Sequence, residues 1–487
     1  MESNRTLWLA VLSIVIVAVL HLLPKAGIAM DAQALMVARW WAIGALCIFG
    51  FKNNSLTTWI LISMVIGMVV GYDFPEIGAN LQILSTIFIQ LIKTVIAPLL
   101  FGTLVVGIAG QSSSKQVGRM SAKAFSYFIA ATTVALVIGL IAINVSKAGK
   151  GIEARKEASP FPLALSDPGL TYEVDSVRNT AKVLYHGKEL VPPPAKPRQD
   201  WKQVILHIFP ENIAKMVYEG AVLQVVVFSL IFGFGLRQVH EPHRARMLEW
   251  AESLSEVMFK FTGIIMYFAP LAVGGAMAFT IGTMGFAVVG NLLQLLGTLY
   301  VALIVFILLV FMPVMFFFKI PVKKFFRAVY EPASLAFATA SSEAALPKAL
   351  KAMEDFGVPR KIVSFVLPTG YSFNLDGSTL YLSLASIFCA QAAGIDLPWE
   401  TQLLLMATLL LTSKGVAGVP RASLVILAAT VHQFSIPEWP IAVILGVDAL
   451  MDMGRTCTNL VGNCLASAVV ARWEGEFDDE KAEAFGH

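Results

Sequence analysis

Charged residues are scarce in this sequence. Asp, Glu, Lys and Arg make up 14% of its 487 residues, whereas about 25% is usual in a soluble globular domain. Hydrophobic residues make up 57%, and the mean hydropathy is +0.72. A soluble chain of this length would form about three domains. The composition excludes that interpretation and indicates an integral membrane protein.

Several kinds of functional site are missing as well. The formal net charge of +3 is too small for the basic face of a nucleic-acid-binding protein. No G-x-x-x-x-G-K-[ST] motif suggests ATP-driven work, and the 7 histidines form no zinc-binding spacing. The 4 cysteines lie in apolar stretches rather than in a disulfide framework. We therefore expect reduced thiols, no cofactor, no transition metal and no nucleic-acid partner.

What the sequence does have is a series of long apolar segments. A helix that crosses the hydrocarbon layer needs about 20 mostly apolar residues. Phe261–Phe318 is long enough for two spans with a break near Gly282 and Gly285. The other segments that meet or approach the required length are Leu7–Leu23, Val37–Phe51, Thr57–Val70, Leu84–Ala109, Ala124–Val145, Val217–Leu236, Ile362–Ala393, Leu403–Val431 and Ile441–Ala471. The sequence predicts an all-α polytopic protein in a lipid bilayer.

Short-loop basic residues predict which side faces the cytoplasm. The cytoplasmic residues are expected to be Lys52 and the clusters Lys115/Arg119/Lys123, Arg237/Arg244/Arg246, Lys319/Lys323/Lys324/Arg327 and Lys348/Lys351/Arg360/Lys361. The first apolar segment resembles a secretory signal, and an uncleaved anchor is the favoured interpretation. The polar, Pro-rich stretch from about Ser146 to Lys202 is then extracytoplasmic, with strand signals around Thr171–Val174 and Val183–Leu190.

These features divide the chain into six regions. They are 1–55, an N-terminal extension with one or two extra transmembrane segments; 56–145, the first core helices; 146–203, the polar insert; 204–328, further core helices; 329–473, the transport core; and 474–487, a cytoplasmic tail.

Two apolar stretches are interrupted near the middle. Small residues fill 333–342 between Pro332 and Pro347, and the arms on either side of Ser341-Ser342 are too short to cross, so a re-entrant hairpin is expected. In 403–431, a linker containing Gly, Pro and two cations separates two apolar arms, which favours a second hairpin over a kinked span. Two such elements in corresponding halves indicate an inverted-repeat carrier.

A third interruption lies at Tyr371–Ser378. Asp376 is the only charged residue between Lys361 and Asp396, so it falls near the middle of a span. Asn, Asp and Gly at this place favour an unwound turn whose carbonyls point at a cation. The alternative is a carboxyl group that is satisfied by its neighbours in the bundle.

The last apolar segment carries the strongest set of polar residues. Steps of 4, 7, 11 and 15 residues from Asp448 rotate by about 40°, −20°, 20° and 60° around a helix, so one face collects the set. Its members are Asp448, Asp452, Arg455, Thr456, Asn459 and Asn463, which we call the polar ridge. A guanidinium matches a carboxylate bidentately, and an aspartate can accept from an ammonium group. Arg455 with Asp452 therefore favours an acidic amino acid as the ligand.

The alternative for the polar ridge is a network that satisfies itself, with Asp448 or Asp452 bridging Arg455. Such a network would not require Thr456, Asn459 and Asn463 on the same face of the helix. An intramembrane aspartyl protease would need paired carboxyls that act as acid and base, and a cation between them counts against an enzyme.

Four motifs in this order resemble the dicarboxylate/amino acid:cation symporters, the family of the archaeal aspartate transporter and the mammalian glutamate carriers. The motifs are Ser341–Pro347 (SSEAALP), Asn374–Ser378 (NLDGS), Gly415–Pro420 (GVAGVP) and Asp448–Asn463, and the similarity covers roughly Leu56–Trp473 without the polar insert. The resemblance implies a homotrimer with eight core transmembrane helices and two re-entrant hairpins per protomer. It also implies an elevator movement in which the second hairpin is the outer gate. The N-terminal apolar pair would be additional.

The resemblance also implies roles for individual residues. Arg455 would bind the side-chain carboxylate of the substrate and Asp452 its amino group. The other substrate positions would be Ser341, Ser342, Ser378, Val419, Thr456 and Asn459. Cation positions would be Gly370, Asn374, Asp376, Asn459 and Asn463, with carbonyls around Ser372, Ser413, Lys414 and Val416 forming a second site, and hydroxyls near Tyr127, Thr132 and Thr133 a third.

The sequence departs from the sodium-coupled pattern of that family. Asn463 stands where sodium-coupled relatives carry an aspartate, Leu375 where they carry a methionine, and Val416 where a threonine is frequent. An amide lacks the charge with which a carboxylate holds sodium, so proton coupling is favoured. Glu343 is then a candidate proton carrier, with Asp376 and Asp448 behind it. The alternative for Glu343 is a side chain that faces cytoplasmic water.

We therefore expect a multi-pass symporter in the cell (inner) membrane that imports glutamate or aspartate with H+ or Na+. A C4-dicarboxylate carrier of the same family is the nearest alternative, and an anion channel is the next.

Overall fold

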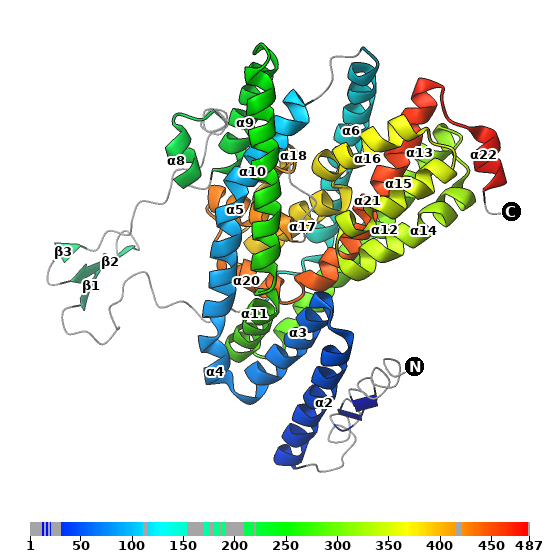
Figure 1. The fold of residues 1–487 in the computed structure, drawn as a ribbon. Coiled ribbons are helices and arrows are strands. Elements are labelled where there is room, and N and C mark those ends of the chain that lie inside the picture. The colour runs from blue at the N-terminus through cyan, green and yellow to red at the C-terminus, as the bar shows by residue number, and fades with distance from the viewer. Residues whose placement is uncertain are drawn as a thin grey trace.

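The computed structural model is a bundle of helices with one small sheet beside it (Figure 1). It describes residues 12–13, 16–17, 20, 31–110, 115–152, 170–175, 180–185, 188–189, 209–218, 221–414 and 421–485. The expected segment Leu7–Leu23 lies almost entirely outside these residues. Within them, five helices are long and apolar enough to cross a membrane, or up to six if one bent pair counts as a span. The all-α polytopic fold is thereby confirmed.

The helices follow the chain in two groups. The first comprises α2 (Ala32–Asn53), α3 (Leu56–Asp73), α4 (Pro75–Asn80), α5 (Gln82–Ala109), α6 (Lys115–Ser146), α8 (Ile213–Tyr218), α9 (Val222–Arg237), α10 (His243–Met266) and α11 (Ala269–Met284). The second comprises α12 (Val288–Phe306), the π-helical turn η2 (Ile307–Phe311), α13 (Met312–Phe317), α14 (Val322–Thr339), α15 (Ser342–Asp355), α16 (Arg360–Phe373), α17 (Asp376–Ala392), α18 (Trp399–Thr412), α19 (Ala422–Gln433), α20 (Trp439–Leu445), α21 (Asp448–Glu474) and α22 (Asp479–Ala484).

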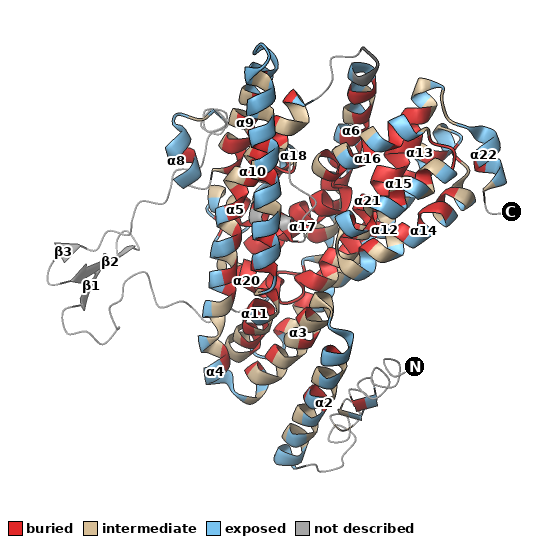
Figure 2. Ribbon diagram, viewed as in Figure 1, coloured by how far each residue is buried: buried red, intermediate tan, exposed pale blue. Residues whose placement is uncertain are grey.

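The helices α17 and α21 form the buried centre of the bundle. Figure 2 shows both mostly in the colour of buried residues, and they pack against each other as well as against α6. Burial on every side distinguishes them from α2 and α3, whose residues are mostly intermediate or exposed in this chain. Because the polar residues of α17 and α21 lie in this centre, any solute they bind is shielded from the lipid.

The helix before Gly285 is longer than its apolar sequence indicates. The expected break is present, since α11 ends at Met284 and Gly285 has a φ of 78°, which suits glycine. The expectation that the first span begins at Phe261 is wrong, because α10 already begins at His243 and bends by 50° into α11. The first half of α10 is charged and mostly exposed, with Ala251 and Ser255 buried, so no continuous apolar run marks it.

The contact between α3 and α11 is made by backbone. A Cβ atom on Gly67 would lie 2.1 Å from the carbonyl oxygen of Gly274, and one on Gly71 would lie 2.5 Å from that of Ala278. Small residues at these positions let the two backbones approach closely, as in other membrane helix pairs. The pair therefore has no room for larger side chains.

Gly67→Ala is expected to destabilise the protein because the new methyl group must push α3 away from α11. Overpacking of this kind costs about 1–3 kcal/mol. Gly297→Ala in α12 is the matched control, since nothing lies within 4 Å of a Cβ atom there and alanine favours a helix. Thermal unfolding in detergent measures both. Equal unfolding midpoints for the two variants would contradict the close backbone contact.

The polar insert contains the small sheet. β1 (Leu170–Asp175) pairs antiparallel with β2 (Thr180–Tyr185), which pairs antiparallel with β3 (Lys188–Glu189). Leu170 lies opposite Tyr185, and Leu184 opposite Glu189. The first strand signal, Thr171–Val174, matches β1, whereas the second, Val183–Leu190, covers the end of β2 and all of β3.

The first interrupted segment forms a helical hairpin. The chain reverses at Ala340, which has a left-handed φ of 50°, and the Ser341 side chain caps α15 by accepting from the Ala344 N–H at 3.3 Å. α14 packs against α15, and both pack against α21. Pro332 and Pro347, which bracket the small residues in the sequence, lie inside α14 and α15, so the two helices extend beyond the stretch between the prolines.

The second interrupted segment has its two arms in α18 and α19. They pack against each other, as a hairpin requires and a kinked span would not. Residues 415–420 lie outside the described residues.

One end of the bundle is tied to the C-terminal tail. Arg119 and Lys123 near the start of α6 lie 2.5 and 2.7 Å from the Glu474 carboxylate at the end of α21. Hydrogen bonds from Arg472, in the last turn of α21, hold the pKa of the Asp479 carboxyl in α22 below its usual value. The starts of α6 and α10 both lie at the upper edge of Figure 1. This arrangement agrees with the expectation that the Lys115 and Arg237 clusters share one side.

Candidate substrate and ion site

The chain unwinds between α16 and α17. Asn374 and Leu375 have φ/ψ of −129°/76° and −106°/63°, which are not helical. A helix start leaves backbone N–H groups without intrahelical partners. Here the N–H groups of Gly377 and Ser378 donate to Asn459 Oδ1 at 2.8 and 3.2 Å. The expected unwound turn is therefore present and is held against α21.

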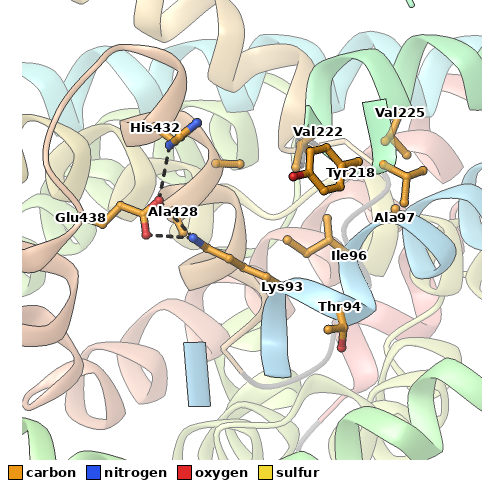
Figure 3. A pocket seen from close by; sticks show the side chains of 12 residues that line it. Lys93, Thr94, Ile96, Ala97, Tyr218, Val222, Val225, Ala428, His432 and Glu438 are labelled. Carbon is orange, nitrogen blue, oxygen red and sulfur yellow. Dashed lines mark hydrogen bonds and ion pairs between the residues drawn. The ribbon is translucent and has the colours of Figure 1, made fainter. Parts of the chain in front are cut away.

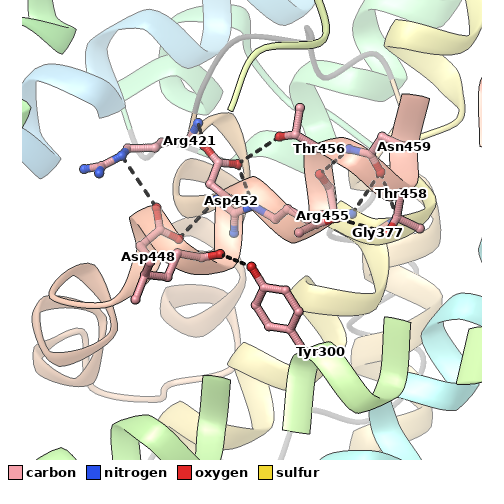
Figure 4. A network of polar contacts seen from close by, with 12 residues as sticks. Tyr300, Gly377, Arg421, Asp448, Asp452, Arg455, Thr456, Thr458 and Asn459 are labelled. Carbon is pink, nitrogen blue, oxygen red and sulfur yellow. Dashed lines mark hydrogen bonds and ion pairs between the residues drawn. The ribbon is translucent and has the colours of Figure 1, made fainter. Parts of the chain in front are cut away.

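The polar ridge lies along α21 and is buried throughout. Arg455 is 0% exposed; its Nε donates to Asp452 Oδ1 at 2.8 Å, and its Nη2 lies 3.1 Å from Asp448 Oδ1 (Figure 4). The guanidinium also stacks over the ring of Tyr381, 4.1 Å from its centroid. Thr456 Oγ1 donates to Asp452 Oδ1 at 3.5 Å. The face predicted from the helical period is thus a connected set of polar contacts.

A second guanidinium reaches the polar ridge from hairpin 2, the segment made of α18, α19 and the residues between them; the pair α14 and α15 is hairpin 1. The backbone N–H of Arg421 donates to Asp452 Oδ2 at 3.2 Å, and its Nε lies 3.8 Å from Asp448 Oδ2. Its guanidinium is 6.0 Å from the ring of Phe88 on α5. The sequence shows Arg421 only as a cation inside a Gly/Pro linker. That position is the sequence feature that could have pointed to its role in the site.

The remaining members of the polar ridge bind the unwound turn. Asn459 Nδ2 donates to Ser378 Oγ at 2.9 Å. Asn374 Nδ2 donates to Asn463 Oδ1 at 3.0 Å and to Asp376 Oδ2 at 3.3 Å. A Cβ atom on residue 370 would lie 2.3 Å from Asn463 Oδ1, so this close approach requires Gly370. These residues form a compact group between α16, α17 and α21.

The ion pairs of the self-satisfied alternative are present in this structure. Asp448 and Asp452 both engage Arg455, as that alternative requires. Some buried polar atoms nevertheless keep unused capacity. Among the described residues, Nη1 of Arg455 and both Nη atoms of Arg421 have no hydrogen-bond partner. Since buried donors are normally paired, these guanidinium atoms are available to an anionic ligand.

Hairpin 1 contributes less than the resemblance implies. Ser341 and Ser342 lie at its tip, and no described contact joins them to the polar ridge, although α14 and α15 pack on α21. Glu343 is exposed in the first turn of α15.

The other implied cation residues are scattered. Ser372 is half-buried near the end of α16, and Ser413 is buried with its hydroxyl donating to Leu410 O at 3.4 Å. Val416 and Val419 lie outside the described residues. Tyr127 and Thr132 are buried, whereas Thr133 is exposed and donates to Ile129 O.

A lysine from hairpin 2 lies beside the unwound turn and was not predicted to act as a cation. Lys414 Nζ donates to Thr132 Oγ1 on α6 at 2.6 Å and to Phe373 O at 3.0 Å. The sequence suggested only the main-chain carbonyl of this residue as a ligand. The structure instead places its ammonium group among the oxygen atoms.

A separate cavity of about 510 Å³ lies between α5, α8, α9 and α19 (Figure 3). Its walls are mostly apolar, and Lys93 pairs with Glu438 at 2.8 Å at its side. No residue of the polar ridge or of the unwound turn lines it. The candidate site is therefore the polar ridge together with the unwound turn, Lys414 and Arg421, which we call the polar centre, rather than this cavity.

The comparison with known families agrees with this geometry. The family model described as the sodium:dicarboxylate symporter family matches residues 56–473. The chain belongs to this family. The match confirms the resemblance and its extent, and it makes the protein a member of a family of multi-pass membrane transporters.

Individual relatives in the family carry two kinds of name. The C4-dicarboxylate transport protein of Laribacter hongkongensis is 38% identical over 437 residues, covering 89% of this chain and 93% of the relative. The proton/glutamate-aspartate symporter of Escherichia coli is 38% identical over 439 residues, covering 88% and 95%. The proton/sodium-glutamate symport protein of Geobacillus stearothermophilus is 36% identical over 437 residues, covering 89% and 98%. Similarity to these relatives does not separate the two substrate classes.

Proposed function

We propose that this symporter imports an acidic amino acid, glutamate or aspartate, across the inner membrane by secondary active transport. The observation that carries the proposal is the pair Arg455 and Asp452 on one buried face of α21, with unpaired guanidinium atoms beside a carboxylate. The guanidinium atoms suit a carboxylate of the substrate, and the Asp452 carboxylate suits its ammonium group.

The charges of the centre support coupling to a cation. The described part of the polar centre holds three carboxylates, Asp376, Asp448 and Asp452, and three cations, Lys414, Arg421 and Arg455. The net charge of these groups without substrate is therefore close to zero. An acidic amino acid adds one negative charge, and burying an uncompensated charge in a membrane costs several kcal/mol. At least one cation must accompany the substrate for the loaded centre to be neutral.

The coupling ion we propose is the proton, with sodium as the alternative. Asn463 offers an amide oxygen that already accepts from Asn374, so this position supplies no carboxylate for sodium. Asp448 is engaged by Arg421 and Arg455. Glu343, which is exposed in this chain, and Asp376, with one oxygen free of hydrogen bonds among the described residues, are the remaining candidate carriers.

A C4-dicarboxylate is the second candidate substrate, and Arg421 is the observation that favours it. Two guanidinium groups on one site could each hold a carboxylate. The Asp452 carboxylate favours the amino acid, because a dicarboxylate offers no ammonium group. An anion channel would show conductance without uphill uptake. We further propose a homotrimer with an elevator movement, as the resemblance implies.

Proteoliposomes with an imposed pH gradient and no sodium are expected to accumulate labelled glutamate or aspartate above its equilibrium level. An inward sodium gradient at zero pH gradient should drive little uptake, because the proton is the proposed coupling ion. Protein-free liposomes and an uncoupler that dissipates the pH gradient are the controls. Flux that stops at equilibration would overturn symport altogether. Full drive by sodium with none by protons would overturn the proton proposal alone.

A further inference from the structure

Lys414 joins three elements that are far apart in the sequence. It follows α18, the first arm of hairpin 2, and its ammonium group donates to Thr132 Oγ1 on α6 and to the carbonyl oxygen of Phe373 at the end of α16. The two distances are 2.6 and 3.0 Å, which are those of well-formed hydrogen bonds. A flexible lysine side chain held at both contacts loses conformational freedom. A favourable interaction of the ammonium group must compensate this loss of conformational entropy.

The charge of Asp376 provides the compensation. Asp376 is 0% exposed, its side chain has one hydrogen bond, from Asn374 at 3.3 Å, and it attracts Lys414 electrostatically. Among the described residues, no Lys, Arg or His nitrogen lies within 4.0 Å of its carboxylate. Lys414 is thus the residue whose positive charge balances the negative charge of Asp376 in this structure.

The surroundings of the ammonium group are those of a small cation. The ammonium group contacts a hydroxyl and a main-chain carbonyl at an unwound helix end, and a buried carboxylate more than 4.0 Å away attracts it. Carbonyl oxygens at unwound helix ends are what membrane carriers use for alkali ions. In this chain a covalently attached ammonium group occupies the place instead.

We propose that the ammonium group of Lys414 is a tethered cation that fills this oxygen-lined site between α6, the unwound turn and hairpin 2. The site then takes up no alkali-metal ion from solution while Lys414 is in place. It adds no metal ion to the transport stoichiometry, because the tethered charge moves with the protein in both directions. This inference concerns ion occupancy and holds whichever substrate the protein carries.

Neutral replacement of Lys414 is expected to turn the place into a sodium site. Purified Lys414→Met in detergent, without substrate, should unfold at a lower temperature than the parent in N-methylglucamine chloride. NaCl at the same ionic strength should restore at least half of the loss with saturable dependence, because a ligand that binds only the folded state stabilises it. The parent and Lys414→Arg should show no saturable sodium response that depends on Asp376.

Two further variants make the result specific. Lys414→Met combined with Asp376→Asn should lose the sodium response, because the carboxylate that attracts the ion is gone. Lys150→Met, which removes an exposed lysine 3.5 Å from Asp396, should behave as the parent does. Lys414→Gln serves as a second neutral variant if Lys414→Met is not recovered.

Three outcomes would overturn the proposal. The first is a folded neutral variant with no saturable sodium response, which would make Lys414 a structural contact only. The second is failure to recover either neutral variant in sodium buffer, where the ion should stand in for the ammonium group. The third is a saturable sodium response of the parent that Asp376→Asn abolishes, since the site would then bind an ion with Lys414 present. The readout is binding, so loss of transport would leave it unaffected.

Discussion

Arg455→Lys is expected to abolish uptake of acidic substrates while leaving insertion and folding intact. Lysine keeps the positive charge that balances Asp448 and Asp452, so the buried centre stays neutral. It lacks the planar fork of the guanidinium, which donates to Asp452 and stacks on Tyr381. Hydrogen bonds to charged groups contribute about 1.5–3 kcal/mol each. Losing two such bonds, about 3–6 kcal/mol in total, should lower kcat/KM roughly 100- to 10,000-fold.

Initial rates of labelled glutamate and aspartate uptake in proteoliposomes measure this effect, with size-exclusion chromatography to verify folding. Arg472→Lys is the control, because Arg472 lies on the same helix and binds Asp479 in the tail, away from the polar ridge. Unchanged uptake kinetics in Arg455→Lys would remove Arg455 from substrate binding. Arg455 would then act only through its ion pairs with Asp448 and Asp452.

Asp452→Asn is expected to change which substrates compete for the site. The amide keeps the size of the side chain and an oxygen that can accept from the Arg421 backbone N–H. It removes the negative charge that attracts the ammonium group of an amino acid. That charge-assisted bond is worth about 1.5–3 kcal/mol, so affinity for aspartate should fall about 10- to 100-fold. Affinity for a dicarboxylate should rise, since removal of the Asp452 carboxylate charge leaves the site with a net positive charge.

Competition by unlabelled succinate and aspartate against a labelled substrate reports the ratio of the two affinities. Asp479→Asn, on the tail, is the control and should leave the ratio as in the parent. If Asp452→Asn keeps the parental ratio, the ammonium group is recognised elsewhere. A parent protein that prefers succinate would favour the C4-dicarboxylate alternative instead.

The features that follow local sequence rules were predictable. The polar ridge follows the helical period, and the unwound turn at Asn374 and Leu375 follows from polar residues in an apolar run. Hairpin 1 follows from the small residues around Ala340. In each case the physical cause lies within a few residues of the feature, so the sequence alone carries the information.

The features that depend on distant partners were not predictable. Lys414 lies 282 positions from Thr132, and Arg421 lies 31 positions from Asp452, so no local pattern shows either contact. The start of α10 at His243 was missed because an amphipathic helix has no continuous apolar run. The roles of Ser341 and Ser342 stay predictions, because their described contacts remain within hairpin 1.

The equal numbers of buried carboxylates and cations bear on how membrane voltage acts on the transport cycle. Moving one elementary charge through 100 mV changes the free energy by about 2.3 kcal/mol. An empty centre with Asp376, Asp448 and Asp452 balanced by Lys414, Arg421 and Arg455 presents almost no charge to that field. In the proposed cycle, the return of the unloaded carrier would then run at nearly the same rate in polarised and depolarised cells, and voltage would influence the loaded step only if more than one cation accompanies the substrate.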